Sequence, residues 1–394
     1  MTRLDGTTAG TTDGTTAGTA AAMTTGRADQ DGAVVRRAPG KLFIAGEYAV
    51  VDAGNPAVLV AVDRYVTVRV GDHPGGGVRV RSDLGGQQVR FTWAGHTLQP
   101  HDAAGAAGLV HVVAAIEHVA AVLAEHGRPL PQCTVEVEST LHETGRKYGL
   151  GSSGAVTVAV IDAVAAYCGL RLGTEERLKL ALLTTVSLDP RASGGDVAAS
   201  TYGGWIRYQA PDRAQVAALA ARAGTAGALA ASWPQLSVRR VPAPAGLLLQ
   251  VGWTGTPASS TALVAGLHAR GWRGTAAHAA FTSASNHCVR QLVTALEDKD
   301  DAGVLAQIRA ARQALAQLDA QVGLGVFTPL LDELVAAAEA AGGAAKPSGA
   351  GGGDCGIALL DAADPARPAE LHRRWTDAGV LPLPLGVAAE GDEE

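Results

Sequence analysis

The segment that most constrains the fold is a glycine-rich loop at residues 147–155, with the sequence KYGLGSSGA. It follows an alternating run at 133–139 that predicts a half-buried strand. It precedes a stretch at 153–168 that is apolar nearly all round, as in a buried helix. A loop between a strand and a helix places unpaired backbone N–H groups at the positive end of the helix dipole. The pattern therefore predicts a phosphate-binding loop.

Other interpretations of this loop need different surroundings. Ser152 or Ser153 would suffice to cap a helix, but capping requires neither three glycines nor a nearby lysine. A dinucleotide-binding fingerprint needs an acid about 20 residues later, at the end of a second strand, whereas Glu175 and Glu176 lie at a predicted helix start. A protein-kinase glycine loop needs a following strand and the motifs H-R-D and D-F-G, and neither motif occurs.

Two further glycine-rich segments accompany the first, APGKLFIAGEY at 38–48 and KPSGAGGGDCG at 346–356. The 394 residues include 50 glycines, nearly twice the usual share of about 7%. Lysine is scarce, because only five of the 32 basic residues are lysines, and three of the five lie one to a loop: Lys41, Lys147 and Lys346. This pairing of glycine with lysine is typical of loops whose backbone approaches phosphate groups.

A single acid stands among small residues in the segment RASGGDVAA at 191–199. Asp196 in this position suits a carboxylate that faces a crowded site, where it accepts a proton from a hydroxyl group or binds Mg²⁺. The plainer interpretation is an aspartate in a glycine turn. Lys41 has a similar pair of interpretations: it neutralises a phosphoryl group in transfer, or it is an ordinary solvated lysine.

Charge, cysteine content and the length of apolar runs argue against several other classes of protein. The net charge of −6 argues against a dedicated nucleic-acid binder. Four dispersed cysteines and eleven histidines include no C-x-x-C and no H-E-x-x-H, so we expect no metal framework and a cytoplasmic location. The longest apolar candidate, 109–124, is interrupted by His111, Glu117 and His118 and falls short of the ~18–20 residues of a membrane span.

Strand-like and helix-like runs alternate along the chain without regular βαβ units, which predicts an α+β protein in two lobes. Residues 1–32, rich in Thr, Gly and Ala, are expected to form a disordered tail. The expected domains are 33–210 and 211–394, with a seam within 206–245, and the Ala-rich stretch 211–232 gives little signal. Strands are predicted at 43–51, 57–62, 65–70, 247–254 and 357–360, a hairpin through Gly85-Gly86, and helices at 109–125, 284–298, 303–320, 328–341 and 364–378.

The three loops, in this order, resemble the three motifs of the GHMP small-molecule kinases, and the resemblance extends over residues 38–360. Within that family, KYGLGSSGAVTVAV, SGGDVAAS and SGAGGGDCGIAL are most similar to the phosphomevalonate kinases of bacteria and fungi. The resemblance implies the two-lobed GHMP kinase fold. Its N-terminal lobe is like ribosomal protein S5 domain 2, its C-terminal lobe is ferredoxin-like, and the site lies in the cleft between them.

The implied reaction transfers the γ-phosphoryl group of ATP to 5-phosphomevalonate, with Mg²⁺ as cofactor. The resemblance implies that Asp196 and Lys41 are catalytic and that Ser153 and Asp196 contact the metal. It assigns ATP binding to Lys147, Gly149, Leu150, Gly151, Ser152, Ser153, Gly154 and Ala155. It assigns substrate binding to Lys41, Tyr48, Arg191, Ser193, Gly194, Lys346, Ser348, Gly349, Ala350 and Gly351.

One segment departs from the relatives. Mevalonate kinases carry a second metal-binding acid, a glutamate, upstream of the catalytic aspartate, but the corresponding residues here, 184–187, are TTVS. Three alternatives therefore stay open: a mevalonate kinase, an ATP-dependent diphosphomevalonate decarboxylase, and a regulator that binds ligands without catalysis. The expected partners are ATP and 5-phosphomevalonate only, with no nucleic acid and no membrane, in a monomer or homodimer.

Overall fold

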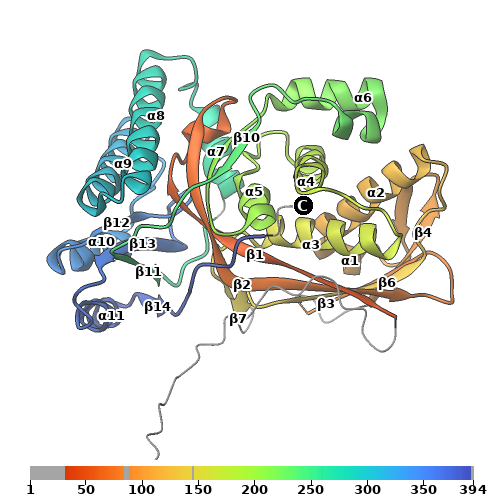
Figure 1. Ribbon diagram of the computed structural model, residues 1–394, viewed down its shortest axis with the longest axis horizontal. Helices are drawn as coiled ribbons and strands as arrows, with labels where there is room; N and C mark the ends of the chain where they lie inside the picture. The colour runs from red at the N-terminus through yellow and green to blue at the C-terminus, as the bar shows by residue number, and fades with distance from the viewer. Residues whose placement is uncertain (1–31, 84–87, 144–145, 259, 392–394) are drawn as a thin grey trace, which may run out of the picture.

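The structure is a computed structural model that describes residues 32–83, 88–143, 146–258 and 260–391. Most of its strands form a large sheet and a smaller one, each with its own helices, and the two lobes lie side by side (Figure 1). The α+β class is confirmed. Residues 1–31 of the expected tail and the Gly85-Gly86 turn lie outside the described residues.

The large sheet has the strand order β10-β9-β2-β6-β3-β4-β5, with β1 paired to β2. Neighbouring strands are antiparallel except β3 and β6, which run parallel. A separate short hairpin, β7 with β8, leads into the glycine loop. The strands of these two sheets are β1 (Val34–Ala45), β2 (Pro56–Asp72), β3 (Val78–Ser82), β4 (Gln88–Ala94), β5 (Thr97–Pro100), β6 (Cys133–Ser139), β7 (His142–Glu143), β8 (Arg146–Lys147), β9 (Trp205–Gln209) and β10 (Ser237–Arg240).

Two predictions about these strands were wrong. The runs 57–62 and 65–70 form one long strand, β2, whose first part pairs with β9 and whose second part pairs with β6. The run 43–51 is a strand only as far as Ala45. Gly46 then turns the chain at φ 99°, where a Cβ would lie 2.6 Å from the Cα of Ala57, and a 3₁₀ helix, η1 (Ala49–Val51), follows. The close approach of two backbones, which needs glycine, ends the strand.

The helices of the first lobe lie on one face of the large sheet. They are α1 (Ala103–Ala106), η2 (Ala107–Leu109), α2 (Val110–Glu125), α3 (Ser152–Tyr167), α4 (Thr174–Leu188), α5 (Gly195–Tyr202) and α6 (Arg213–Ala230). Helix α3 contacts β1 and β2 on one side and α2, α4 and α5 on the others. Its enclosure on all sides confirms the buried helix predicted from its apolar sequence.

The stretch Ala103–Glu125 is long and apolar enough, by composition alone, to cross a membrane. Half of the apolar part is buried inside the protein, where α2 packs against α3 and α4. A core helix passes the same test of length and composition, so this stretch is weak evidence for a membrane span.

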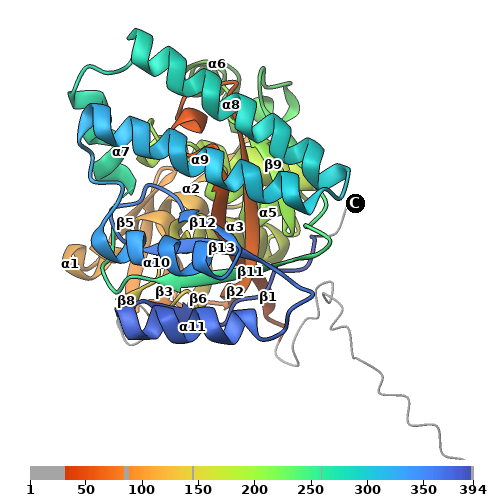
Figure 2. The same cartoon turned by 90° about the vertical axis from the view of Figure 1, so that its left-hand side faces the viewer.

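The second lobe has an antiparallel sheet of order β12-β13-β11-β14. Helices α9, α10 and α11 contact it, and α8 with α9 forms a helical hairpin (Figure 2). The indole of Trp375 is fully buried here and donates to the carbonyl of Leu334 at 3.0 Å. The elements are α7 (Ser260–Ala269), α8 (Ala276–Glu297), α9 (Asp301–Val322), α10 (Pro329–Ala340), α11 (Arg367–Ala378), β11 (Leu247–Trp253), β12 (Ala344–Pro347), β13 (Cys355–Asp361) and β14 (Leu381–Leu383).

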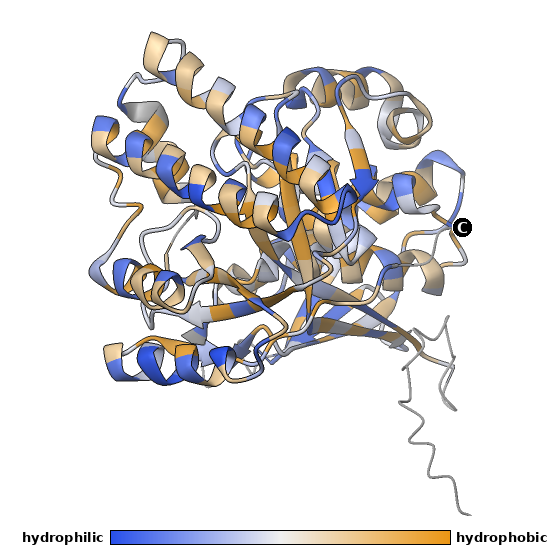
Figure 3. Cartoon of the chain, turned by 60° about the vertical axis from the view of Figure 1, so that its left-hand side comes forward, coloured by the Kyte–Doolittle hydropathy of each residue, from blue (hydrophilic) through white to orange (hydrophobic). Residues whose placement is uncertain are grey.

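The boundary expected after residue 210 is too early. Strand β10 extends the large sheet by pairing with β9, and α6 contacts α2 and α4, so both elements belong to the first lobe. The chain crosses to the second lobe at 241–246, between β10 and β11. It later returns, because Val387 bridges to Val62. Figure 3 shows hydrophobic strands in the middle of the molecule and hydrophilic positions along the outer helices.

Candidate active site

Lys41 lies on β1 and contacts the glycine loop. Its backbone N–H donates to the carbonyl of Leu150 at 2.8 Å, and its Nζ donates to the carbonyl of Gly149 at 3.3 Å. Only 9% of the residue is exposed. Gly40 makes this approach possible, since a Cβ there would lie 2.8 Å from the carbonyl oxygen of Leu150. Strand β1 therefore holds the lysine directly against the glycine loop.

The glycine loop ends at the first turn of α3. Helix α3 begins at Ser152, and its N-cap is Gly151, at φ 76°, with no side-chain capping bond in the described chain. The interpretation of Ser152 or Ser153 as a simple cap is therefore wrong. Because no side chain caps this end, the backbone N–H groups of the first turn point toward the space where an anion would bind.

Each glycine of the G-x-G-x-x-G pattern lies against a charged side chain. A Cβ on Gly149 would lie 2.4 Å from Cγ of Asp354, and one on Gly151 would lie 2.9 Å from Cε of Lys41. A Cβ on Gly154 would lie 2.7 Å from Oδ2 of Asp196. These approaches are closer than any real Cβ contact, so the glycines make room for one lysine and two aspartates.

Asp196 reaches this position because α5 starts directly before it. The N-cap of α5 is Gly194, at φ 76°, where a Cβ would lie 2.2 Å from a methyl group of Leu182. The hydroxyl of the buried Tyr208 donates to the carbonyl of Ser193 at 2.7 Å and fixes the preceding loop. Ser193 and Gly194 therefore shape the backbone that presents Asp196.

His111 is a neighbour of the site that the sequence analysis did not select. It lies in the first turn of α2, within electrostatic range of Asp196 and Lys147. Burial lowers the pKa of its imidazole, so the ring is neutral at pH 7. Its Nδ1 is buried and has no hydrogen-bond partner within the described residues. The one signal for His111 in the sequence was that it interrupts the apolar run 109–124.

The third glycine loop is fastened to β1 and η1 by two side chains. Oγ of Ser348 accepts from the N–H of Phe43 at 2.9 Å and donates to the carbonyl of the same residue at 3.0 Å. The hydroxyl of Tyr48 donates to the carbonyl of Ala350 at 2.5 Å, and burial raises the pKa of this phenol. Both side chains were expected to bind substrate. Their polar groups instead join the two lobes.

Lys346 is the clearest difference from expectation. It is fully buried, and its Nζ forms an ion pair with Glu47 and donates to the carbonyl of Pro347 at 2.7 Å. A buried, paired ammonium group cannot meet an anionic substrate, so this structure does not support a substrate contact by Lys346.

The glycines of the third loop adopt a conformation that favours glycine. Gly349 and Gly351 have positive φ, and the backbone of Gly351 passes close to the carbonyl of Val326.

The remaining expected cations lie at the surface of the site. Lys147 is exposed at the end of β8, and Arg191 is exposed beside Asp189, with 3.3 Å between Nε and Oδ1. At 184–187, where relatives were expected to carry an acid, Thr184 and Thr185 are buried and donate to carbonyls one turn back in α4. This segment therefore supplies no metal ligand.

The oxygen donors near the loop suit Mg²⁺. Ser152 and Ser153 carry hydroxyl groups at the start of α3, and the carboxylate of Asp196 lies beside them at Gly154. Within the described ranges, no cluster of three or more His, Cys, Asp or Glu could hold a metal by itself. This donor set fits an ion that takes one or two protein oxygens and completes its shell with water and substrate phosphates.

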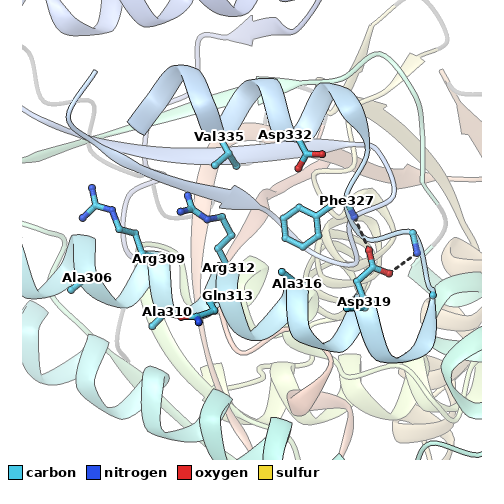
Figure 4. Close-up of a pocket in the computed structure, with 13 residues that line it drawn as sticks. Ala306, Arg309, Ala310, Arg312, Gln313, Ala316, Asp319, Phe327, Asp332 and Val335 are labelled. Carbon is cyan, nitrogen blue, oxygen red and sulfur yellow. Dashed lines mark hydrogen bonds between the residues drawn. The ribbon is translucent and has the colours of Figure 1, made fainter. Parts of the chain in front are cut away.

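A large groove lies elsewhere, between α9 and α10 (Figure 4). Its volume is about 1140 Å³, and none of the residues that line it belongs to the three glycine loops. Asp319 at one end accepts from the N–H groups of Gly325 and Phe327, at 2.7 and 3.2 Å. The carbonyl of Val326 in turn accepts from Gly352 at 2.8 Å, so the wall of the groove supports the third loop.

Sequence comparison identifies the family. Residues 111–204 match the model of the GHMP kinases N terminal domain, and residues 292–381 match that of the GHMP kinases C terminal domain. A phosphomevalonate kinase of Streptomyces sp. strain CL190 is 58% identical over 377 residues, which cover 94% of this chain and all of the relative. The chain belongs to the GHMP kinase family.

Solved structures agree with this placement in the family. A Lin0012 protein from Listeria innocua has a TM-score of 0.82 at 32% identity, covering 91% of this chain and 99% of that one. Streptococcus pneumoniae phosphomevalonate kinase, solved with phosphomevalonate and AMPPNP, has a TM-score of 0.78 at 28% identity and covers 90% and 99%. Mevalonate kinases are more distant. The mevalonate kinase of Thermococcus gammatolerans is 29% identical, and the match covers 91% of this chain and 97% of that protein.

Proposed function

We propose that this GHMP kinase is a phosphomevalonate kinase, which transfers the γ-phosphoryl group of ATP to 5-phosphomevalonate and releases ADP and 5-diphosphomevalonate. The observation that carries the proposal is the 58% identity with a phosphomevalonate kinase along the whole of that relative. The second support is the likeness to a phosphomevalonate kinase solved with phosphomevalonate and AMPPNP.

The arrangement of charges suits this chemistry. The acceptor is a phosphate group, which is already anionic at pH 7, so a general base has little to do. Catalysis then depends on holding two polyanions in line and neutralising the charge between them. Lys41 would carry out this neutralisation. The support is its position, since its Nζ donates to the carbonyl of Gly149 in the glycine loop.

ATP would bind with its phosphates on the glycine loop. The N–H groups from Gly149 to Gly154 and the hydroxyls of Ser152 and Ser153 would hold them, and Lys147 would add a positive charge at the edge. The N–H of Ala155, expected to bind ATP, instead donates to the carbonyl of Gly151 at 3.1 Å within the helix. Ser153 and Asp196 would hold Mg²⁺, which when bound neutralises charge on the phosphates. Asp196 would also receive any proton that the acceptor phosphate still carries.

The acceptor would lie between Lys41 and the loops at 191–194 and 348–351. Arg191 is the exposed cation on that side, and the backbone of Ser193, Gly194 and Gly349 would line the space. Tyr48, Lys346 and Ser348 would act indirectly by fixing β1 and the third loop. We also propose a cytoplasmic location, for which the four free cysteines are the support.

An acceptor assay tests the proposal. Purified protein with Mg-ATP is given mevalonate, 5-phosphomevalonate or 5-diphosphomevalonate in turn, and ADP, phosphorylated products and CO₂ are measured. We expect turnover with 5-phosphomevalonate alone, with no release of CO₂. Turnover of mevalonate alone would instead identify a mevalonate kinase, and release of CO₂ from 5-diphosphomevalonate would identify a decarboxylase.

A further inference from the structure

We propose that Asp354, in the third glycine loop, is a positioning residue that fixes the first glycine of the phosphate loop from the opposite lobe. The inference rests on the proposed function only for the measurement of KM values, which needs turnover of 5-phosphomevalonate. Asp354 has no role in the mechanism described above. Its carboxyl group nevertheless lies against Gly149, at the position where a Cβ on that glycine would come within 2.4 Å of Cγ.

The backbone of Asp354 is held rigidly. Its N–H donates to the carbonyl of Thr256 at 2.8 Å, and its carbonyl accepts from both the N–H and the hydroxyl of Thr254, at 2.9 and 3.1 Å. The residue has φ 49°, in the left-handed region that non-glycine residues seldom occupy. A strained conformation held by three hydrogen bonds indicates that the direction of this side chain is fixed by its surroundings.

The carboxylate joins two segments that are distant in the sequence. Oδ1 accepts from the N–H of Ala258 at 3.1 Å, and the rest of the group packs on Gly149. The adjacent contacts support the same docking. Sγ of Cys355 lies 3.0 Å from the carbonyl of Tyr148, and the ring of Tyr148 meets that of Trp253 edge to face at 5.3 Å.

The position of Gly149 matters because its carbonyl accepts from Nζ of Lys41. The series of contacts therefore runs from the 254–258 segment through Asp354 and Gly149 to Lys41. Burial raises the pKa of the Asp354 carboxyl group, and the hydrogen bond from Ala258 and the positive charge of Lys41 oppose this shift only in part. Loss of the carboxyl group would remove the contact from the second lobe that bears directly on Gly149, although the contacts at Tyr148 would remain.

The test uses three variants of the full chain. D354A removes the contact with Gly149, and D354N keeps the shape and an oxygen acceptor for Ala258. D361N is the matched control, because Asp354 directly precedes strand β13 and Asp361 ends it, and the carboxylate of Asp361 also accepts one backbone N–H, from Ala363 at 2.9 Å. Affinity for a non-hydrolysable ATP analogue is measured by calorimetry, and KM for ATP and for 5-phosphomevalonate by steady-state kinetics.

We expect D354A to weaken binding of the analogue and to raise KM for ATP by about tenfold or more, because small displacements of positioned groups have effects of this order. KM for 5-phosphomevalonate should change far less, D354N should recover most of the loss, and D361N should match the unchanged protein. If D354A does not fold, as judged by circular dichroism, D354S takes its place.

Two results would overturn the inference. One is a D354A or D354S protein that binds the analogue as tightly as the unchanged protein. The other is a D354N protein that loses as much affinity as D354A. In that case the shape and hydrogen bonding of the side chain would not account for the binding of the analogue. Calorimetry needs no acceptor, so failure of the proposed function would appear in the assay of the unchanged protein and leave this test intact.

Discussion

The carboxylate of Asp196 lies directly against Gly154, where a Cβ would come within 2.7 Å of Oδ2. Asp196 is in the first turn of α5 and Gly154 is in the first turn of α3, so two helix N-termini meet at this contact. The positive ends of both helix dipoles favour negative charge at this point, such as that of a phosphate group. The glycine is therefore part of the site, although it contributes no side chain.

Replacement of this glycine by alanine should displace Asp196. We expect G154A to lower kcat by about 100-fold, because a shift of about 1 Å in a positioned group has an effect of that size. The melting temperature should change little. G108A is the control, since a Cβ on Gly108 meets nothing within 4 Å in the described part of the chain. Full activity in G154A would show that the position of Asp196 is not critical.

The charges of Lys41 and Asp196 should be needed for turnover but not for folding. We expect K41M to lower kcat/KM by about 10³-fold, the range found when one donor to a negatively charged transition state is removed. We expect D196N to lower it by about 10²-fold or more, because this change removes the carboxylate that would hold Mg²⁺ and accept a proton. Circular dichroism spectra and melting curves should match those of the unchanged protein. If either variant keeps near-normal turnover, that residue does not have the catalytic role we assign to it.

The buried pair of Lys346 and Glu47 should contribute to stability. K346M leaves the carboxylate of Glu47 buried without its partner, and we expect the free energy of unfolding to fall by about 3–5 kcal/mol. The double variant K346M/E47Q removes the unpaired charge and should regain most of the loss. Denaturant unfolding of both proteins measures this. A stable K346M protein with a greatly raised KM for 5-phosphomevalonate would instead favour a substrate contact.

Ser348 offers a second test of the difference between expectation and structure. S348A leaves the N–H and carbonyl of Phe43 without their partner, and we expect a loss of about 1–3 kcal/mol in the free energy of unfolding. KM for 5-phosphomevalonate should rise by less than about threefold, equivalent to under ~0.7 kcal/mol. Normal stability with a large rise in KM would contradict the structural role.

Stability should depend on pH through buried histidines. Burial lowers the pKa of His118 below its ordinary value of 6.5, and Nδ1 of this ring lies 2.8 Å from the carbonyl of Ala114. As pH falls below 6.5, the unfolded chain binds a proton that the folded chain does not, so the free energy of unfolding decreases. Urea unfolding between pH 7.5 and 5.5 should show this decrease. In H118Q it should be smaller, and an unchanged slope would contradict the assignment.

Much of the architecture could be predicted because its signals are local. The loop at 147–155 and the helix after it are defined by neighbouring residues, and both were found. Helix α6 was missed because an alanine-rich sequence has little hydrophobic periodicity, and Gly224, at φ 76° and ψ 174°, interrupts it. Strand β2 was divided in two because Asp63 and Arg64 interrupt its apolar run, although the pairing with β1 continues on both sides.

The sequence alone predicted which loop would bind phosphate, because glycines, a lysine and a helix start occur within a few residues of each other. Only the tertiary structure decided which charges meet that backbone. Asp354 is 205 positions from Gly149, and Lys346 meets Glu47 across 299 positions. Burial and pairing at such separations depend on how two lobes pack. For that reason Lys346, expected to bind substrate, became a buried ion-pair partner, and Asp354, which had no assigned role, came to lie against the phosphate loop.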